Sequence, residues 1–320
     1  MLPIEYKPSE EYIKLFYDSL KKYDKKIAIA AGVVGELILK NRGQNVVLTS
    51  LARAGTPVGV LIKRYIKFKY NINLPHYSIS IIRGKGIDEN AIMYILRNHP
   101  GAEIQFIDGW TGKGAITKEL QKACMDFQEK WGIYINDDLA VLADPGHCVS
   151  TFGTREDFLI PSACLNSTVS GLVSRTVHRE DLIKEDDFHG AKYYKELRAE
   201  DVSNFFVDII SSRFEEVTED IEEDLKRISN IDTSPSWLGM KDVEEIQKEF
   251  GIDNVHFIKP GIGETTRVLL RRIPWKILIR EDCRNLDHIL LLAKEKDVPV
   301  EAYPLKAYNC CGIIKSLRRE

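Results

Sequence analysis

The sequence predicts an α/β fold: a parallel sheet covered by helices on both faces, a helical insertion, and a small α/β/α domain near the C-terminal end. Three observations indicate this class. Short, almost continuously apolar runs alternate with helical patterns up to about residue 143, which is typical of parallel strands buried on both faces. A helical, acidic stretch covers residues 180–230, and a compact α/β pattern of about eighty residues follows it.

Strands are expected at residues 45–50, 77–82, 103–107 and 139–143. Helical patterns separate them, and an amphipathic helix capped by Ser9 precedes the first strand. Ligands of parallel α/β sheets bind beyond the carboxyl ends of the strands. The loops in which to look for a site are therefore residues 51–56, 83–87, 108–114 and 144–148.

The length of 320 residues suggests two domains, at residues 1–230 and 241–320, joined by a linker at 231–240. The formal net charge of -3 excludes a global basic field, so a nucleic-acid site would have to be a local patch. We read no signal peptide, and no apolar run approaches the ~18 residues of a membrane helix. Six scattered cysteines do not suggest disulfides, and we expect a cytoplasmic protein.

The most informative loop follows the third predicted strand. It places Asp108 at the tip of that strand, and after it come Gly109 and the helix-initiating turn Thr111-Gly112-Lys113-Gly114-Ala115. Successive backbone N–H groups in such a turn, with the helix N-terminus, form an anion site. Asp108 is placed to accept hydrogen bonds from ribose hydroxyls. Ordinary strand-to-helix turns also favour Asp and Gly, so the loop alone leaves both interpretations open.

Two further loops at the same edge of the predicted sheet carry cations. Arg53, Ala54 and Gly55 follow the first strand, where the glycine permits close backbone approach and the arginine can hold phosphate oxygens. Arg83 and Lys85, which flank a glycine, follow the second strand and suit a mobile loop that closes over a diphosphate. A turn with solvated charges is the alternative for each loop.

These loops resemble those of type I phosphoribosyltransferases, and longer strings resemble one bacterial family over roughly residues 1–210. The strings include Ser50-Leu-Ala-Arg-Ala-Gly-Thr-Pro57, Ser80-Ile-Ile-Arg-Gly-Lys-Gly-Ile-Asp88, Phe106-Ile-Asp-Gly-Trp-Thr-Gly-Lys-Gly-Ala-Ile116 and Gly153-Thr-Arg-Glu-Asp-Phe-Leu-Ile-Pro-Ser-Ala-Cys-Leu-Asn166. The family is labelled both a phosphoribosyltransferase of tellurium-resistance and stress-response gene clusters and a cysteine protease, StiP. Type I transferases usually have two adjacent acids at the strand end, whereas here the second position is Gly109.

The transferase label implies an enzyme that uses phosphoribosyl diphosphate and Mg²⁺ to make a nucleotide-like product in a stress response. Asp108 would hold the ribose, and Ala54, Gly55, Gly109 and residues 111–115 would bind the phosphates. Arg53, Arg83, Lys85 and the metal would stabilise the departing diphosphate. The acceptor base is not identified, and no metal site made by the protein alone is predicted. A homodimer is compatible with this interpretation.

Two alternatives stay open. Without the second acid, the domain also fits a non-catalytic nucleotide- and RNA-binding protein. A cysteine protease needs a thiolate and a histidine base. Its candidate nucleophiles are Cys148 and Cys164, and its candidate bases are His147, His178 and His189. His147 and Cys148 are adjacent, and on a strand adjacent side chains point to opposite faces.

The segment after residue 241 resembles the RNA-binding domain shared by Pelota and kink-turn-binding ribosomal proteins. In that family a glycine-rich helix start with an acidic residue contacts RNA. Here the matching residues are Gly261, Gly263, Glu264, Thr265 and Arg267. The resemblance implies a structured RNA as partner, with helix N-terminal amides on phosphate. A small interaction module that has kept the fold and lost RNA is the alternative.

Overall fold

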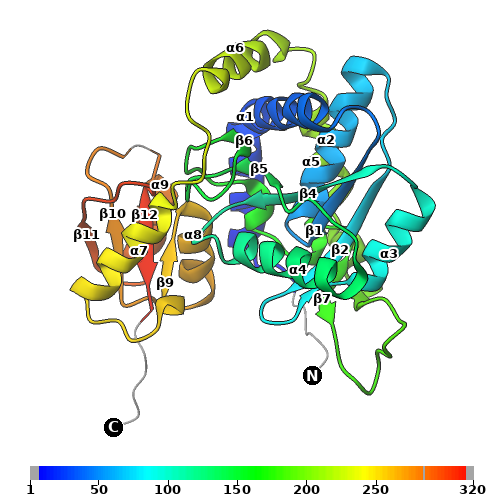
Figure 1. Cartoon of the computed structure of the whole chain (residues 1–320). Coiled ribbons are helices and arrows are strands. Elements are labelled where there is room, and N and C mark those ends of the chain that lie inside the picture. Colours follow the sequence, from blue (N-terminus) through cyan, green and yellow to red (C-terminus); the bar gives the residue numbers. More distant parts are fainter. Residues whose placement is uncertain (1–6, 284, 315–320) are drawn as a thin grey trace.

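The computed structural model describes residues 7–283 and 285–314, apart from the side chains of Ser174 and Arg175. Figure 1 shows two parts, each built around its own sheet, with the C-terminal part in yellow to red beside the larger N-terminal part. The predicted mixed α/β architecture with a parallel-rich sheet is confirmed.

The larger sheet has six strands. Their order is β3 (Gly86–Ile87), β2 (His76–Ile82), β1 (Val46–Ala52), β4 (Glu103–Trp110), β5 (Leu139–Ala143) and β6 (Thr151–Thr154). All neighbouring pairs are parallel except β2 with β3. The four strands expected from apolar runs correspond to β1, β2, β4 and β5. The short strands β3 and β6 carry too few apolar residues to be recognised in the sequence.

Helices cover both faces of this sheet. Together α1 (Glu10–Arg42) and α2 (Gly55–Tyr70) pack on one face. The crossovers through α3 (Glu89–Asn98) and α4 (Ala115–Trp131) run in the opposite direction along the sheet, so right-handed connections place these helices on the other face. Ser9 stands at the N-cap of α1, but its side chain makes no capping hydrogen bond.

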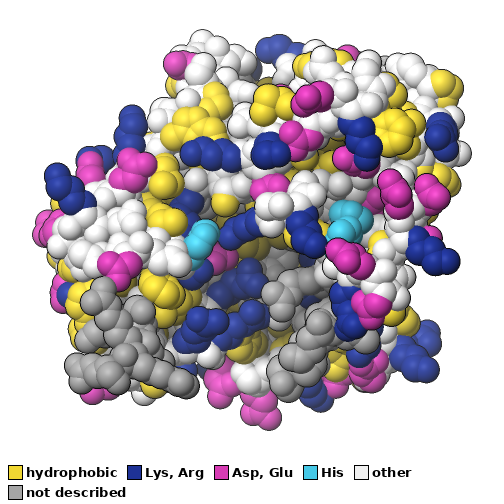
Figure 2. Space-filling model, turned by 60° about the horizontal axis from the view of Figure 1, so that its bottom comes forward, with side chains coloured by type: hydrophobic (Ala, Val, Ile, Leu, Met, Phe, Trp, Pro, Cys, Tyr) yellow, Lys and Arg dark blue, Asp and Glu magenta, His cyan; other side chains and the backbone are white. Residues whose placement is uncertain are grey.

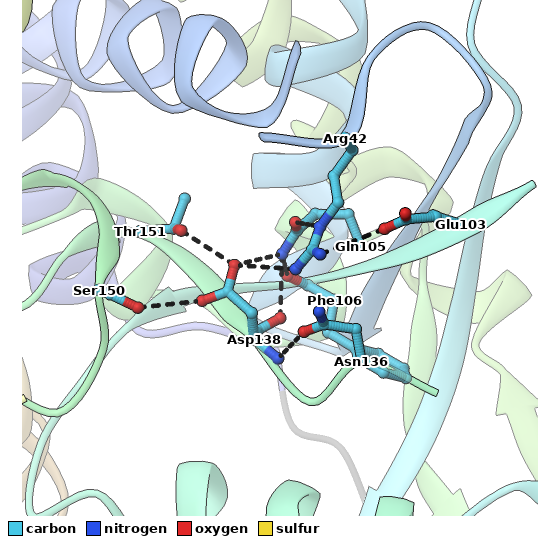
Figure 3. Close-up of polar contacts among 8 residues, drawn as sticks. All are labelled: Arg42, Glu103, Gln105, Phe106, Asn136, Asp138, Ser150 and Thr151. Carbon is cyan, nitrogen blue, oxygen red and sulfur yellow. Dashed lines mark hydrogen bonds and ion pairs between the residues drawn. The ribbon is translucent and has the colours of Figure 1, made fainter. Parts of the chain in front are cut away.

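A polar network fixes the amino-terminal edge of the sheet, opposite the predicted site (Figure 3). Arg42, at the end of α1, donates to Gln105 at 3.1 Å and pairs with Asp138 at 3.4 Å. Asp138 in turn accepts from the hydroxyl of Thr151 at 2.9 Å, and Gln105 donates to its carbonyl. Gln105 lies near the start of β4, Asp138 precedes β5 and Thr151 begins β6. The network therefore sets the relative positions of α1 and three strands.

Residues 151–230 differ from the helical insertion that was expected to begin near residue 180. After two single 3₁₀ turns, η1 (Pro161–Ala163) and η2 (Ser167–Val169), strands β7 (Val173–Val177) and β8 (Gly190–Tyr193) pair antiparallel. A further 3₁₀ segment, η3 (Lys195–Glu200), precedes the helices α5 (Ser203–Ser211) and α6 (Thr218–Ser229). The acidic helix α6 buries Ile221 against Gly32 of α1, and its carboxylates lie on the solvent side.

The C-terminal sheet has the order β11 (Val300–Ala302), β10 (Lys276–Ile279), β12 (Cys310–Ile313), β9 (Ile258–Pro260). Its helices are α7 (Leu238–Glu249), α8 (Ile262–Arg271) and α9 (Asp287–Glu295), with the 3₁₀ turn η4 (Val255–Phe257) before β9. Helix α7 begins inside the predicted linker, and β12 lies between β10 and β9. Only β10 and β11 are parallel; β12 is antiparallel to both of its neighbours.

One hydrophobic core spans the two parts, and the C-terminal part has a second, separate core cluster that includes Val243, Ile258 and Leu278. Buried Ile262 and Leu269 of α8 and Ile277 of β10 belong to the same cluster of contacting side chains as the core of the larger domain. Apolar burial therefore stabilises the docking of the C-terminal domain as well as each domain separately. No helix within residues 7–283 and 285–314 is long and apolar enough to cross a membrane.

The contact between α2 and β4 leads to a stability prediction. A Cβ on Gly55 would collide with the carbonyl oxygen of Ile107 and lie 3.1 Å from Cα of Asp108, both backbone atoms that cannot move aside. We expect Gly55→Ala to lower the free energy of unfolding by about 1–3 kcal/mol in urea titrations. Gly112→Ala is the matched control because no atom lies within 4 Å of its added Cβ. Equal stability of the two variants would contradict this packing.

Candidate functional site

The candidate site lies at the carboxyl edge of the larger sheet, where β1 and β4 are neighbours and their loops leave towards opposite faces. This is the crevice in which doubly wound sheets bind ligands. A cavity of about 220 Å³ there is lined by predicted residues of both domains. They are Ala54, Arg83, Asp108, Thr111, Gly112, Lys113, Gly114 and Ala115 from the N-terminal domain and Glu264 and Arg267 from α8.

The remaining predicted residues lie around this cavity rather than in it. Gly55 is buried against β4, as described above. Gly109 donates its N–H to the Asp108 carboxylate at 2.8 Å. Lys85 lines a larger cleft between the domains, and Arg53 lines a separate cavity beside β2. The structure therefore brings most of the predicted phosphate-binding residues together, but it does not gather all the predicted cations.

The C-terminal domain covers the glycine-rich turn. Lys113 donates through Nζ to the carbonyls of Val255 at 2.6 Å and Ile258 at 3.1 Å. The hydroxyl of Tyr308 donates to the carbonyl of Gly112 at 3.0 Å. A Cβ on Gly114 would collide with the ring of Trp237, so the ring packs directly on this glycine. The turn thus contacts the neighbouring domain, and the cavity of about 220 Å³ that it lines is shared with that domain.

Asp108 and Asp144 are both carboxylates that burial makes less acidic. Burial raises the pKa of Asp108 to about 7, with only the N–H of Gly109 opposing the shift. Asp144 follows β5 and accepts from the Thr111 hydroxyl at 2.6 Å and from the N–H of Cys148 at 2.7 Å. Its pKa is raised to about 6, again by burial. Asp144 thereby ties the turn after β4 to the turn after β5.

Cys148 lies under the glycine-rich turn. Its thiol donates to the carbonyl of Gly112 at 3.6 Å and would lie 3.0 Å from a Cβ on Gly114, on which Trp237 also packs. Burial is the main cause that raises the pKa of this thiol to about 12, and the negative charge of Asp144 is the second. The positive charges of Lys118 and Arg155 lower the pKa. Cys148 is 1% exposed, which closes it to solvent in this conformation.

His147 and Cys148 lie in the turn that follows β5 and not in a strand. His147 has φ 53°, in the left-handed region, and its carbonyl accepts from the N–H of Trp237 at 2.9 Å. The simple alternation of strand side chains therefore does not apply to this pair. The His147 ring contacts the guanidinium of Arg155, and burial together with that charge lowers its pKa to about 4.

The other nucleophile and base candidates lie elsewhere. Cys164 is 2% exposed and sits beside Ser19 of α1, and burial raises its pKa to about 12. His189 shares a hydrogen bond with the Ser80 hydroxyl at 2.5 Å, and its ring centroid is 4.6 Å from that of His178. These two histidines line cavities that do not include Cys148. Within the described ranges there is no group of three or more His, Cys, Asp or Glu side chains that could hold a metal ion.

The predicted RNA-binding helix start is occupied by a carboxylate of the other domain. Asp157 accepts from the N–H of Ile262 at 2.9 Å and from that of Asn309 at 2.9 Å. Gly261, with φ 86°, donates to the carbonyl of Cys310, and Gly263 lies near the Trp110 ring. Asp157 therefore takes the place at the N-terminus of α8 where a phosphate would bind.

The side chains of the predicted RNA residues divide into two groups. Thr265 is fully buried and donates to the carbonyl of Lys259 at 3.1 Å, so it supports the loop before the helix. Glu264 and Arg267 form an ion pair at 3.5 Å and line the cleft between the domains. Asp157, Trp237 and Tyr308 were not predicted, because each acts through residues far away in the sequence.

Fold and site define a two-domain α/β protein whose C-terminal domain closes over a loop that carries a cysteine. The model of the family described as tellurite-like stress resistance cysteine protease StiP matches residues 1–211, and that of the PELOTA RNA binding domain matches residues 237–316. The chain is 31% identical over 332 residues to Cysteine protease StiP of Acinetobacter baylyi, covering 99% of this chain and 84% of the relative. The chain belongs to the StiP family.

These comparisons correct the predicted function. The resemblance to the StiP family and to the Pelota domain is confirmed, but the predicted phosphoribosyltransferase activity is contradicted, because the family and the relative are both named as cysteine proteases. The contacts of Gly112, Lys113 and Gly114 explain the error in physical terms. The ammonium of Lys113 can bind a phosphate or the carbonyls of a neighbouring domain, and the local sequence does not distinguish the two.

The raised pKa of Asp157 predicts that docking of the two domains depends on pH. Burial raises its pKa from 3.8 to about 6, so its contribution to docking is complete below pH 3.8 and is lost as the pH rises through about 6. We expect the docking equilibrium to weaken by roughly tenfold between pH 5 and pH 8. Small-angle X-ray scattering would detect this as a larger radius of gyration at the higher pH.

Asp157→Asn is the control for this prediction, because it keeps the size of the side chain and removes its titration. Asp144, with a pKa of about 6, titrates in the same range in both proteins, so the comparison isolates Asp157. An equal pH dependence in the variant would contradict the assignment.

Proposed function

We propose that this chain is a cysteine peptidase with Cys148 as the nucleophile, and that the docked C-terminal domain keeps it inactive. The observation that carries this proposal is that the side chain of Cys148 packs against the glycine-rich turn. This places it at the edge of the sheet where α/β proteins bind their ligands. Membership of a family named for cysteine proteases supports it. Cys164 is the weaker candidate because it lies beneath α1, beside Ser19.

The surroundings of Cys148 account for an inactive state. A peptidase needs the thiolate, and a thiol with a pKa of about 12 is protonated at neutral pH. Trp237 and Tyr308, both from the C-terminal domain, contribute to this burial: the ring of Trp237 packs on Gly114 and the Tyr308 hydroxyl bonds to Gly112. Undocking of that domain would admit water to the thiol and lower its pKa.

The charged groups that remain after undocking act on the thiol in both directions. Lys118 and Arg155 lower the pKa of Cys148 through their charges, whereas the carboxylate of Asp144 raises it. His147 is the adjacent base, and its imidazole is neutral at pH 7 because its pKa is about 4. Loss of the contact with Arg155, whose guanidinium also donates to the carbonyl of Thr233 in the segment before α7, would make His147 more basic.

The proposed reaction is acyl transfer in two steps. The Cys148 thiol gives its proton to His147, and the sulfur attacks the carbonyl carbon of a peptide bond. The C–N bond breaks, the leaving amine takes the proton from His147, and a thioester remains on Cys148. Water then attacks the thioester, which releases a carboxylic acid and restores the thiol. We assign the stabilisation of the oxyanion to backbone N–H groups of the glycine-rich turn, whose Gly112 carbonyl lies 3.6 Å from the Cys148 sulfur.

RNA binding by residues 237–316 is a second candidate function. The match to the Pelota RNA-binding model supports it, as does the group of Lys and Arg side chains along α8. The amides at the α8 N-terminus are bonded to Asp157, so we do not place the RNA phosphates there.

Hydrolysis of fluorescently labelled casein tests the peptidase. We expect Cys148→Ser to lower the rate by about a thousandfold or more, because it removes the nucleophile. Trp237→Ala should raise the rate by uncovering the thiol. Cys283→Ser is the matched control, since its half-buried thiol lies outside the site, and it should keep the wild-type rate. Full activity of Cys148→Ser, or loss of activity only in Cys164→Ser, would disprove the assignment.

A further inference from the structure

A cleft of about 990 Å³ lies between the two domains. Its lining includes six Lys or Arg side chains and one acidic side chain, Glu264. Figure 2 shows this face, with dark-blue Lys and Arg side chains gathered around the hollow. The whole chain has a net charge of -3, so the cleft is a local concentration of positive charge. Such a cleft attracts an anionic ligand.

Both domains supply the cations. Arg83 and Lys85 come from the turn between β2 and β3, Lys259 comes from β9, and Arg267, Arg271 and Arg272 come from α8 and the residue after it. In the described part of the chain, only Arg267 among these six has an ion pair with a carboxylate, that of Glu264 at 3.5 Å. The other five have no carboxylate partner there; Lys85 lies 3.5 Å from Nδ1 of His178, and Arg271 contacts the hydroxyl of Tyr12.

Burial and the positive charges of the cleft lower the pKa values of neighbouring basic groups. Burial and the charges of Lys259 and Arg83 lower the pKa of Lys113 to about 8. The pKa of His256 is lowered by burial and by Lys113, Arg83 and Lys259. Cations of both domains thus act on the same groups, which indicates that they face one shared space. A bound polyanion would reverse these shifts.

The cleft also offers apolar surface to a ligand. Ile81 and Ile82 of β2, Ile116 of α4, and Phe257 and Val268 of the C-terminal domain line it together with the cations. His178 and His256, both exposed, stand at its margin. Cations that follow a backbone, combined with apolar and aromatic side chains that receive bases, are the features of single-strand nucleic-acid sites. A purely acidic peptide would leave the apolar surface unused.

We infer that this cleft binds a single-stranded RNA segment, with its phosphates on Arg83 and Lys85 of one domain and Arg271 and Arg272 of the other, and its bases against Ile82, Phe257 and Val268. The inference rests on the proposed RNA binding and is independent of the peptidase. It differs from the site expected at the start of α8, because Asp157 already occupies that helix terminus. The RNA site then belongs to neither domain alone.

Fluorescence anisotropy with a labelled oligouridine of about twelve nucleotides tests the inference on the full chain carrying Cys148→Ser. Two double variants remove exposed cations from each side of the cleft: Arg83→Ala with Lys85→Ala, and Arg271→Ala with Arg272→Ala. Each double variant should weaken binding about tenfold. Each should also reduce the slope of log K against log salt concentration by about 1.4, because two phosphate contacts are lost and each contributes about 0.7 for single strands. A duplex of the same length should bind more weakly.

Lys40→Ala with Lys67→Ala is the matched control, because it removes two exposed lysines that do not line the cleft. It should change the affinity less than twofold. If RNA binds but the cleft variants behave like the control, the RNA site lies elsewhere and the inference fails while RNA binding stands. If oligouridine does not bind at all, both fail. Displacement by an oligoglutamate at equal concentration would overturn RNA as the occupant, and circular dichroism confirms that each variant is folded.

Discussion

The structure depends on the docking of the C-terminal domain against the glycine-rich turn that follows β4. Lys113 and Gly112 make the polar contacts, through the carbonyls of Val255 and Ile258 and the hydroxyl of Tyr308. Trp237 adds an apolar contact on Gly114. Asp157 completes the interface from the other side, where it holds the start of α8. Because these groups are buried or half-buried, losing a partner is costly, and the contacts hold the domains in their relative position.

Docking decides what the molecule offers to other molecules. It covers the glycine-rich turn and Cys148 beneath it with Trp237 and Tyr308, and it brings Arg83 and Lys85 opposite the cationic side of α8. One interface therefore buries the Cys148 thiol and at the same time forms a cleft suited to a polyanion. Separation of the domains would expose the thiol and disrupt the cleft. The buried carboxyl of Asp157 makes that separation sensitive to pH.

Much of the fold could be predicted because its information is local. Apolar runs give β1, β2, β4 and β5, and the Asp108 loop was correctly expected at the carboxyl edge of the sheet. The β7–β8 pair could not be predicted in this way, since its strands are short and partly exposed. The site was only partly predictable. The partners of Asp157 are 105 and 152 residues away in the sequence, so no local pattern reveals them.

The interpretation of the glycine-rich turn shows where sequence reasoning fails. Its amides, its lysine and its carboxylate suit a sugar phosphate, and the turn lies in the expected place. The structure shows the lysine and the Gly112 carbonyl bonded to another domain, and the family to which the chain belongs is named for a cysteine protease. The residue that changes the interpretation is Cys148, which the sequence offers as one of two candidate nucleophiles for the protease alternative.

The rate at which Cys148 reacts with iodoacetamide, followed by peptide mass spectrometry at pH 8, tests the central claim most directly. If the docked domain covers the thiol, Cys148 in the native protein should react at least about a hundredfold more slowly than in the urea-unfolded chain, as slowly as the buried core thiol Cys124. A native rate close to the unfolded rate would show that the C-terminal domain does not cover the glycine-rich turn.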